Sequence, residues 1–135
     1  MKRFILTGAL ALLAALGLQA QNYKLVWLND DAPAEAVALI SQRTAQMLEA
    51  GGLSLSDAED AAPLTVLAQV SSRLDNVGSM NQVALNVELT FSANGVSETF
   101  PLKGVGADDA DAWLRAAKQF LPKSKAASAF VAQLK

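Results

Sequence analysis

Apolar and polar residues alternate most regularly from Gln82 to Phe91. A period of two places successive side chains on opposite faces of a strand, so this segment is expected to bury one face and expose the other. Its expected buried residues are Val83, Leu85, Val87, Leu89 and Phe91. Residues 64–71 alternate in the same way. Their expected buried residues are Leu64, Val66, Ala68 and Val70. Residues 23–28 are apolar on both faces, which is typical of an interior strand.

The Asn94-Gly95 pair predicts a hairpin with a two-residue type I′ turn. Counting outward from this turn, Leu89 faces Phe100 and Val87 faces Leu102. All four residues are apolar and lie on the expected core side. A slip of one residue would break this match, so the pattern predicts the register as well as the turn.

Three segments have the 3.6-residue period of a helix with one buried stripe. The first, residues 34–50, ends at Gly51-Gly52, as expected for a left-handed cap. Its apolar face is Val37, Ile40, Thr44, Met47 and Leu48. The second follows Asp108 and ends before Pro122. Its expected stripe is Ala110, Trp113, Leu114, Ala117, Phe120 and Leu121. The third begins at Ser124. Its face is Ala127, Phe130, Val131 and Leu134.

The order of these elements is strand, helix, three strands and two helices, with residues 53–63 as a polar loop. One apolar sheet face and helices that each bury one stripe predict a two-layer α/β sandwich. We expect a mixed, mostly antiparallel four-stranded sheet with the helices on one face.

The segment GVGADDADAW, residues 104–113, has the glycines and acids of a binding loop. A dinucleotide fingerprint would need a third glycine where Asp109 stands. A calcium loop would need Asp or Asn where Trp113 stands. The segment is therefore interpreted as a helix start, with Asp108 as the cap and Asp111 in a capping-box position.

Residues 1–20 have the layout of a secretory signal peptide, with a basic start, an apolar stretch and a small residue at Ala20. The apolar stretch of about 14 residues is shorter than the roughly 20 of a spanning helix. We expect cleavage after Ala20, which leaves residues 21–135 as one periplasmic or secreted domain without stable membrane insertion. An uncleaved anchor is the alternative.

The chain contains neither cysteine nor histidine. Disulfides, thiol nucleophiles, Ser-His-Asp catalysis and the usual zinc sites are therefore excluded. A formal net charge of −2 disfavours a nucleic-acid partner. We predict no catalytic, cofactor-binding or metal-binding residue.

The connection between two strands at residues 71–82 is the main candidate for an interaction surface, because polar loops on a rigid sheet often bind ligands. Its polar side chains are Arg73, Asp75, Asn76, Asn81 and Gln82. These groups could converge on a sugar or a peptide backbone. The alternative is a twisted strand end and a turn at Val77-Gly78, with solvated polar groups.

The acidic residues Asp57, Glu59 and Asp60 are interpreted as a solvated loop rather than a cation patch. A carboxylate-dependent hydrolase would need two acids about 5 to 10 Å apart in a cleft, and no spacing in the sequence marks such a pair.

Trp27 and Trp113 are expected in the core rather than as platforms for sugars. Lys118, Lys123 and Lys125 form a small basic group, suited to the C-terminal end of a helix and too small to indicate a polyanionic partner.

The element order resembles small α/β modules of bacterial envelope proteins, such as the N-terminal domain of TolB and the CsgG/LpoB-like group. The matching features are the helix end at Gly51-Gly52, the Asn94-Gly95 hairpin and the glycine-led segment GVGADDADAWLRAAKQFL. Many of those proteins are lipoproteins or parts of longer chains, whereas this chain has no cysteine to carry a lipid. The resemblance implies a non-catalytic role in envelope assembly or protein contact, and it carries over no functional residue by position.

The sequence is therefore interpreted as an exported, non-enzymatic protein of the cell envelope that contacts another envelope protein. Two alternatives remain. One is a binder of a small polar ligand or glycan fragment through residues 71–82, and the other is a carboxylate-dependent hydrolase.

Overall fold

The structure is a computed structural model that describes residues 22–77 and 81–135. The signal peptide expected at residues 1–20 lies outside the described residues. The elements in chain order are β1 (Asn22–Trp27), α1 (Ala34–Ala50), β2 (Ser54–Leu55), β3 (Ala62–Val77), β4 (Gln82–Ala93), β5 (Val96–Gly106), α2 (Asp109–Ala117) and α3 (Lys125–Leu134).

The strands form one mixed sheet in the order β2-β1-β3-β4-β5. β1 runs parallel to β2 and β3, whereas β4 runs antiparallel to β3 and β5. The α/β class is confirmed, and β2 is one strand more than expected. Ser54 and Leu55 lie in residues 53–63, for which the sequence predicts a loop. They pair with Asn22 and Tyr23 of β1. A strand of two residues is too short to show a periodic pattern.

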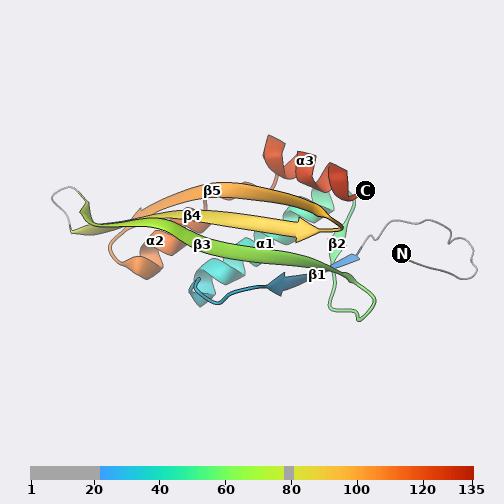
Figure 1. The fold of residues 1–135 in the computed structure, drawn as a ribbon, viewed down its shortest axis with the longest axis horizontal. Coiled ribbons are helices and arrows are strands. Elements are labelled where there is room, and N and C mark those ends of the chain that lie inside the picture. Colours follow the sequence, from blue (N-terminus) through green and yellow to red (C-terminus); the bar gives the residue numbers. More distant parts are fainter. Residues whose placement is uncertain (1–21, 78–80) are drawn as a thin grey trace, which may run out of the picture.

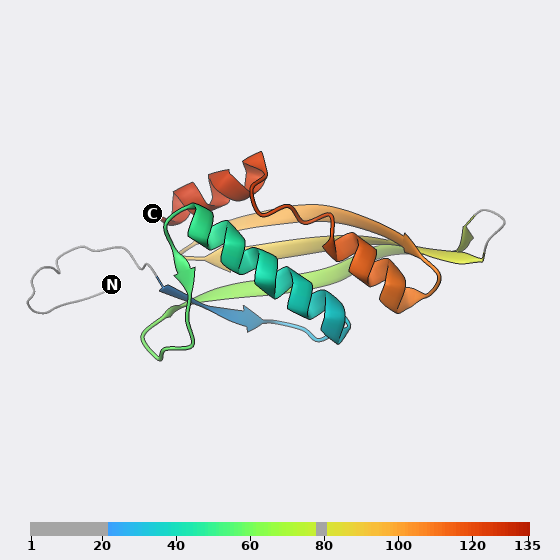
Figure 2. The same cartoon turned by 180° about the vertical axis from the view of Figure 1, so that it is seen from behind.

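All three helices lie on one face of the sheet, as expected (Figures 1 and 2). The opposite face carries rows of hydroxyl groups across β4 and β5. Thr90 Oγ1 lies 2.9 Å from Thr99 Oγ1, and Ser92 Oγ lies 2.9 Å from Ser97 Oγ. None of the helices in the described part of the chain is long and apolar enough to cross a bilayer.

The hairpin between β4 and β5 has the predicted turn and register. Asn94 and Gly95 have φ values of 52° and 76°, as a type I′ turn requires. Leu89 pairs with Phe100 and Val87 pairs with Leu102, and all four side chains are buried. All five residues expected on the apolar face of β4 are also buried.

Helices α1 and α3 follow their predicted patterns. Four of the five expected face residues of α1 are buried, and the fifth, Val37, is half-buried. Gly52, with φ 84°, is the left-handed residue that ends this helix. In α3, the Ser124 hydroxyl accepts a hydrogen bond from the Ala127 amide at 3.2 Å. The four expected face residues of α3 are buried.

The centre of the core is a cluster of phenylalanine rings that joins the sheet to the C-terminal half of the chain. The ring centroid of Phe91 on β4 lies 5.8 Å from that of Phe100, 5.4 Å from that of Phe120 and 6.2 Å from that of Phe130. Because these rings come from β4, β5, the segment after α2, and α3, the cluster ties together elements that are distant in sequence.

Helix α2 packs against β5 through its backbone, which the predicted stripe did not anticipate. A Cβ atom at Gly104 would overlap the backbone of Ala112 and Ala116, and one at Gly106 would lie 2.6 Å from the Ala112 nitrogen. The glycines of the GVG segment therefore permit close contact between helix and strand. This contact turns Ala112 and Ala116 toward the sheet, and both are fully buried.

The predicted stripe of α2 is therefore only partly right. Trp113, Ala117 and Phe120 are buried, but Ala110 and Leu121 are exposed and Leu114 is half-buried. The helix ends at Ala117, before Pro122 is reached. At this end Arg43 Nη1 donates to the carbonyl oxygens of Lys118, at 2.6 Å, and Phe120, at 3.0 Å. A cation from α1 thus satisfies carbonyl groups that follow α2.

Candidate interaction surface

The residues predicted to form a loop at 71–82 belong mainly to two strands. β3 continues to Val77 and β4 begins at Gln82, so the expected loop is wrong over most of its length. The turn expected at Val77-Gly78 falls partly outside the described residues. We call residues 71–77 of β3, Asn81 and residues 82–84 of β4 the arm. In Figures 1 and 2 the arm projects past α2, beyond the layer of helices.

A β-bulge at the base of the arm determines which way its side chains point. The pairing of β3 with β4 shifts between Val70 and Ser72, which leaves Ser71 as an extra residue. Val70, expected in the core, is 38% exposed at this irregularity. Beyond the bulge Arg73 pairs with the buried Leu85, so Arg73 lies on the same face of the sheet as the helices.

Two carboxylates hold Arg73 in this position. Its Nη1 lies 2.6 Å from Asp75 Oδ1, and its Nη2 lies 2.8 Å from Asp109 Oδ1 at the first residue of α2. The hydrogen bond with Asp109, followed by that with Asp75, raises the pKa of the Arg73 guanidinium. The three side chains remain exposed, so the pairs orient the arm and add little to stability.

The start of α2, where Asp109 lies, is capped as the sequence predicts. The Asp111 amide donates to Asp108 Oδ1 at 2.8 Å, and the Ala107 amide donates to Asp111 Oδ2 at 3.0 Å. In an ordinary capping box the amide of the N-cap residue donates this second hydrogen bond, whereas here the donor is Ala107, the residue before the N-cap. This bond is the main cause of the lowered pKa of Asp111. The segment is thus a helix start that also anchors the arm.

The other polar residues of the arm lie nearer its tip. Asp75 and Asn76 fall in a second irregularity of the β3–β4 pairing, between Leu74 and Val77. Asn76 and Asn81 have φ values of 56° and 50°, in the left-handed region that asparagine tolerates. Among the described residues, no side-chain hydrogen bond joins Asn81 or Gln82 to Arg73, Asp75 or Asn76. Convergence of all five on one ligand stays a prediction.

Leu74 is an exposed residue of the arm that is not among the predicted site residues. Its side chain is 64% exposed. In the pairing register it lies beside Ala84 of β4, which lies beside Val105 of β5. This row is on the face opposite the helices. In the sequence, Leu74 is an apolar residue among polar neighbours. The bulge at Ser71 changes the alternation of faces along β3, so the sequence does not indicate which face Leu74 occupies.

The remaining candidates take the positions of ordinary surface or core groups. Asp57, Glu59 and Asp60 are exposed, and the described residues contain no group of three acids placed to hold a metal ion. Trp113 is buried, and Trp27 packs half-buried against the core.

Comparison with known proteins gives a likeness of structure only. No family model matches the chain, and no curated protein matches it. One similar solved structure is a minor lipoprotein from Acinetobacter baumannii, with 20% identity and a TM-score of 0.39, covering 84% of this chain and 88% of the other. Another is a PelC dodecamer from Paraburkholderia phytofirmans, with 15% identity and a TM-score of 0.34, covering 85% and 83%. A second PelC dodecamer structure has 18% identity and a TM-score of 0.35, covering 85% and 86%.

Neither TolB nor a member of the CsgG/LpoB-like group is among these three structures. At these identities and scores the likeness assigns no activity, ligand or partner to this chain.

Proposed function

We propose that this chain is an exported, non-enzymatic protein of the cell envelope that contacts another protein through the arm. The observation that carries this proposal is the arm itself, a strand pair that projects beyond the helix layer with residues 71–76 exposed. The exposed residues 71–76 of β3 add little to the core of the domain, and they offer backbone and side chains to a partner.

The chemistry of the arm suits a protein contact. Protein interfaces commonly have an apolar centre surrounded by polar groups. Leu74, which is 64% exposed, supplies an apolar group on the face opposite the helices, and Arg73 supplies a charged group on the other face, so a partner that encloses the arm would meet both kinds of group. Arginine is also among the residues that most often dominate binding energy. The contacts with Asp75 and Asp109 already restrict the Arg73 side chain, so Arg73 loses less conformational entropy when a partner binds.

Two features of the sequence support the rest of the proposal. The basic, apolar and small-residue order of residues 1–20 supports export. The lack of histidine and cysteine in the whole chain leaves few of the usual catalytic groups, which supports a role in contact rather than catalysis.

Combining Arg73→Ala, Leu74→Ser and Asp75→Ala is expected to leave the melting temperature nearly unchanged, because exposed ion pairs contribute about 0–1 kcal/mol. Asn76 is kept because its φ of 56° suits asparagine better than alanine. The triple variant should lose a crosslinked partner that the wild-type protein recovers reproducibly from whole envelopes.

A matched control changes exposed residues of α1, with Gln42→Ala, Gln46→Ala and Glu49→Ala combined. This variant should recover the partner as the wild type does. Equal recovery by the arm variant and the control would contradict the proposal. So would a wild-type protein that captures nothing and instead hydrolyses a glycan or peptide.

A further inference from the structure

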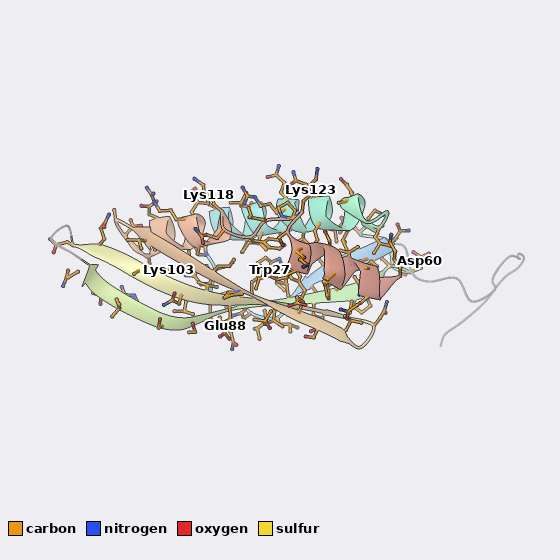
Figure 3. All side chains as sticks on the ribbon, turned by 90° about the horizontal axis from the view of Figure 1, so that it is seen from above. Trp27, Asp60, Glu88, Lys103, Lys118 and Lys123 are labelled. Carbon is orange, nitrogen blue, oxygen red and sulfur yellow. The ribbon has the colours of Figure 1, made fainter. Side chains whose placement is uncertain are left out.

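A second surface lies at the free edge of the sheet, away from the exposed tip of the arm. An open depression of about 450 Å³ lies between β5 and the C-terminal half of α2. Its lining residues are Lys103, Gly104, Val105, Arg115, Lys118 and Gln119. Figure 3 labels Lys103 on the sheet and Lys118 on the side of the helices.

The depression is positively charged in a chain with a net charge of −2. Three of its six lining residues are cationic and none is acidic. Arg115 Nε pairs with Asp111 Oδ1 at 3.2 Å. Within residues 22–77 and 81–135, neither Lys103 nor Lys118 takes part in a salt bridge. Arg43 already donates to the carbonyl groups of Lys118 and Phe120, so these groups do not compensate the charges of Lys103 and Lys118.

The backbone of β5 beside the depression has unused hydrogen-bonding groups. A two-residue hairpin makes the residues next to its turn a hydrogen-bonded pair, and the bonded and non-bonded pairs then alternate along the strands. The odd-numbered residues of β5 therefore direct their backbone groups outward, away from β4. Apart from the sheet pairing with β4, no backbone hydrogen bond joins Lys103 or Val105 to another described segment.

Pro101 agrees with this assignment. It is one of the outward-directed positions, where the missing N–H costs no bond within the sheet. Proline and lysine at an edge also restrict uncontrolled strand pairing. Because Pro101 offers no donor, the edge that can accept a new strand is the part beyond it, at Lys103 and Val105, beside the three cations.

We infer that this edge binds an extended acidic peptide segment, which adds as a strand along residues 103–105 of β5. Strand addition draws affinity from the backbone and specificity from alternate side chains. Lys103 pairs with Asn86 on the face opposite the helices, whereas Arg115 and Lys118 belong to α2 and its end. Successive side chains of an added strand point to opposite faces of the sheet. One acidic side chain would therefore lie near Lys103, and the next would lie near Arg115 and Lys118. The depression is open, which suits a chain lying across it better than a small molecule that needs enclosure.

The probe is a capped hexaglutamate peptide, added to the isotopically labelled protein at low salt and followed by NMR. The amide signals of Lys103 and Val105 should shift and become protected from hydrogen exchange. Hexalysine should cause neither change. Hexaglutamate that is N-methylated at alternate residues should bind at least about tenfold more weakly, because it cannot complete the backbone bonds.

Charge reversal tests the cations with a matched control. Lys103→Glu combined with Lys118→Glu should weaken binding of hexaglutamate by about tenfold or more, because like charges then face each other. Lys123→Glu combined with Lys125→Glu makes the same change in net charge at two other exposed lysines, and it should change binding less than about twofold.

Several results would overturn the inference. These are unchanged Lys103 and Val105 signals, equal binding of the N-methylated peptide, equal losses in the two charge-reversed variants, or the same protection pattern with inorganic phosphate alone. The variant with changes at Arg73, Leu74 and Asp75 should bind hexaglutamate like the wild type. Failure at the β5 edge can therefore be told apart from failure of the proposed function of the arm.

Discussion

Phe91→Ala is expected to lower the free energy of unfolding by about 3–5 kcal/mol, the usual range for removing a buried phenylalanine ring. Phe91 is fully buried, and its ring contacts those of Phe100, Phe120 and Phe130. Its removal leaves a cavity where the sheet, the segment after α2, and α3 meet. Urea unfolding, followed by circular dichroism, measures the loss as a lower midpoint.

The matched control for this change is Thr90→Ala, one residue earlier on β4. Thr90 lies on the opposite face, where its hydroxyl contacts only that of Thr99 among the described residues. Its replacement should change the free energy of unfolding by no more than about 1 kcal/mol. Equal losses for the two variants would mean that the two faces of β4 have been wrongly assigned.

Gly104→Ala is expected to cost about 3 kcal/mol, at the upper end of the range for an overpacked core. The new Cβ would overlap backbone atoms of Ala112 and Ala116 rather than a flexible side chain. Helix α2 would have to move away from β5, which would also disturb Trp113. The measurements are the urea midpoint and the near-ultraviolet circular dichroism of the tryptophan.

Two further variants show whether the cost comes from backbone contact. Ser97→Ala, at an exposed position of the same strand, should be nearly neutral. Adding Ala116→Gly to Gly104→Ala should restore nothing, since the obstructing atoms belong to the backbone of α2. A neutral Gly104→Ala variant, or full rescue by Ala116→Gly, would contradict close packing of helix and strand.

The features that were predicted correctly depend on local pattern. The faces of β4 and α3 follow from their periods of 2 and 3.6 residues, and the register of the hairpin follows from Asn94-Gly95. In each case the residues that determine the structure are close together in the chain. The α/β class then follows, because these faces must be buried against one another.

The features that were missed depend on contacts between distant segments. Helix α2 turns its alanines to the sheet because Gly104 and Gly106 let the two backbones approach, and its end is bound by Arg43 of α1. The two residues of β2 form a strand only because β1 lies beside them. None of these contacts leaves a periodic signal in the sequence.

The sequence predicted some of the exposed residues of the candidate site, but it did not predict their secondary structure or their contacts. The sequence singled out Arg73 and Asp75, and both are exposed, but on a strand rather than in a loop. Nothing local indicated that Arg73 would reach Asp109, which is 36 residues away. The depression beside β5 was missed as well, because its lysines and arginine come together only when α2 packs on the sheet.

Site-specific photocrosslinking in intact cells tests the proposed role of the arm most directly. A photoreactive amino acid is placed at Leu74 in one variant and at Thr99, an exposed position on the hydroxyl-bearing face, in another. The proposal predicts a discrete adduct of higher mass from position 74 and none from position 99. An unmodified band from position 74, or the same adduct from both positions, would contradict a protein contact made by the arm.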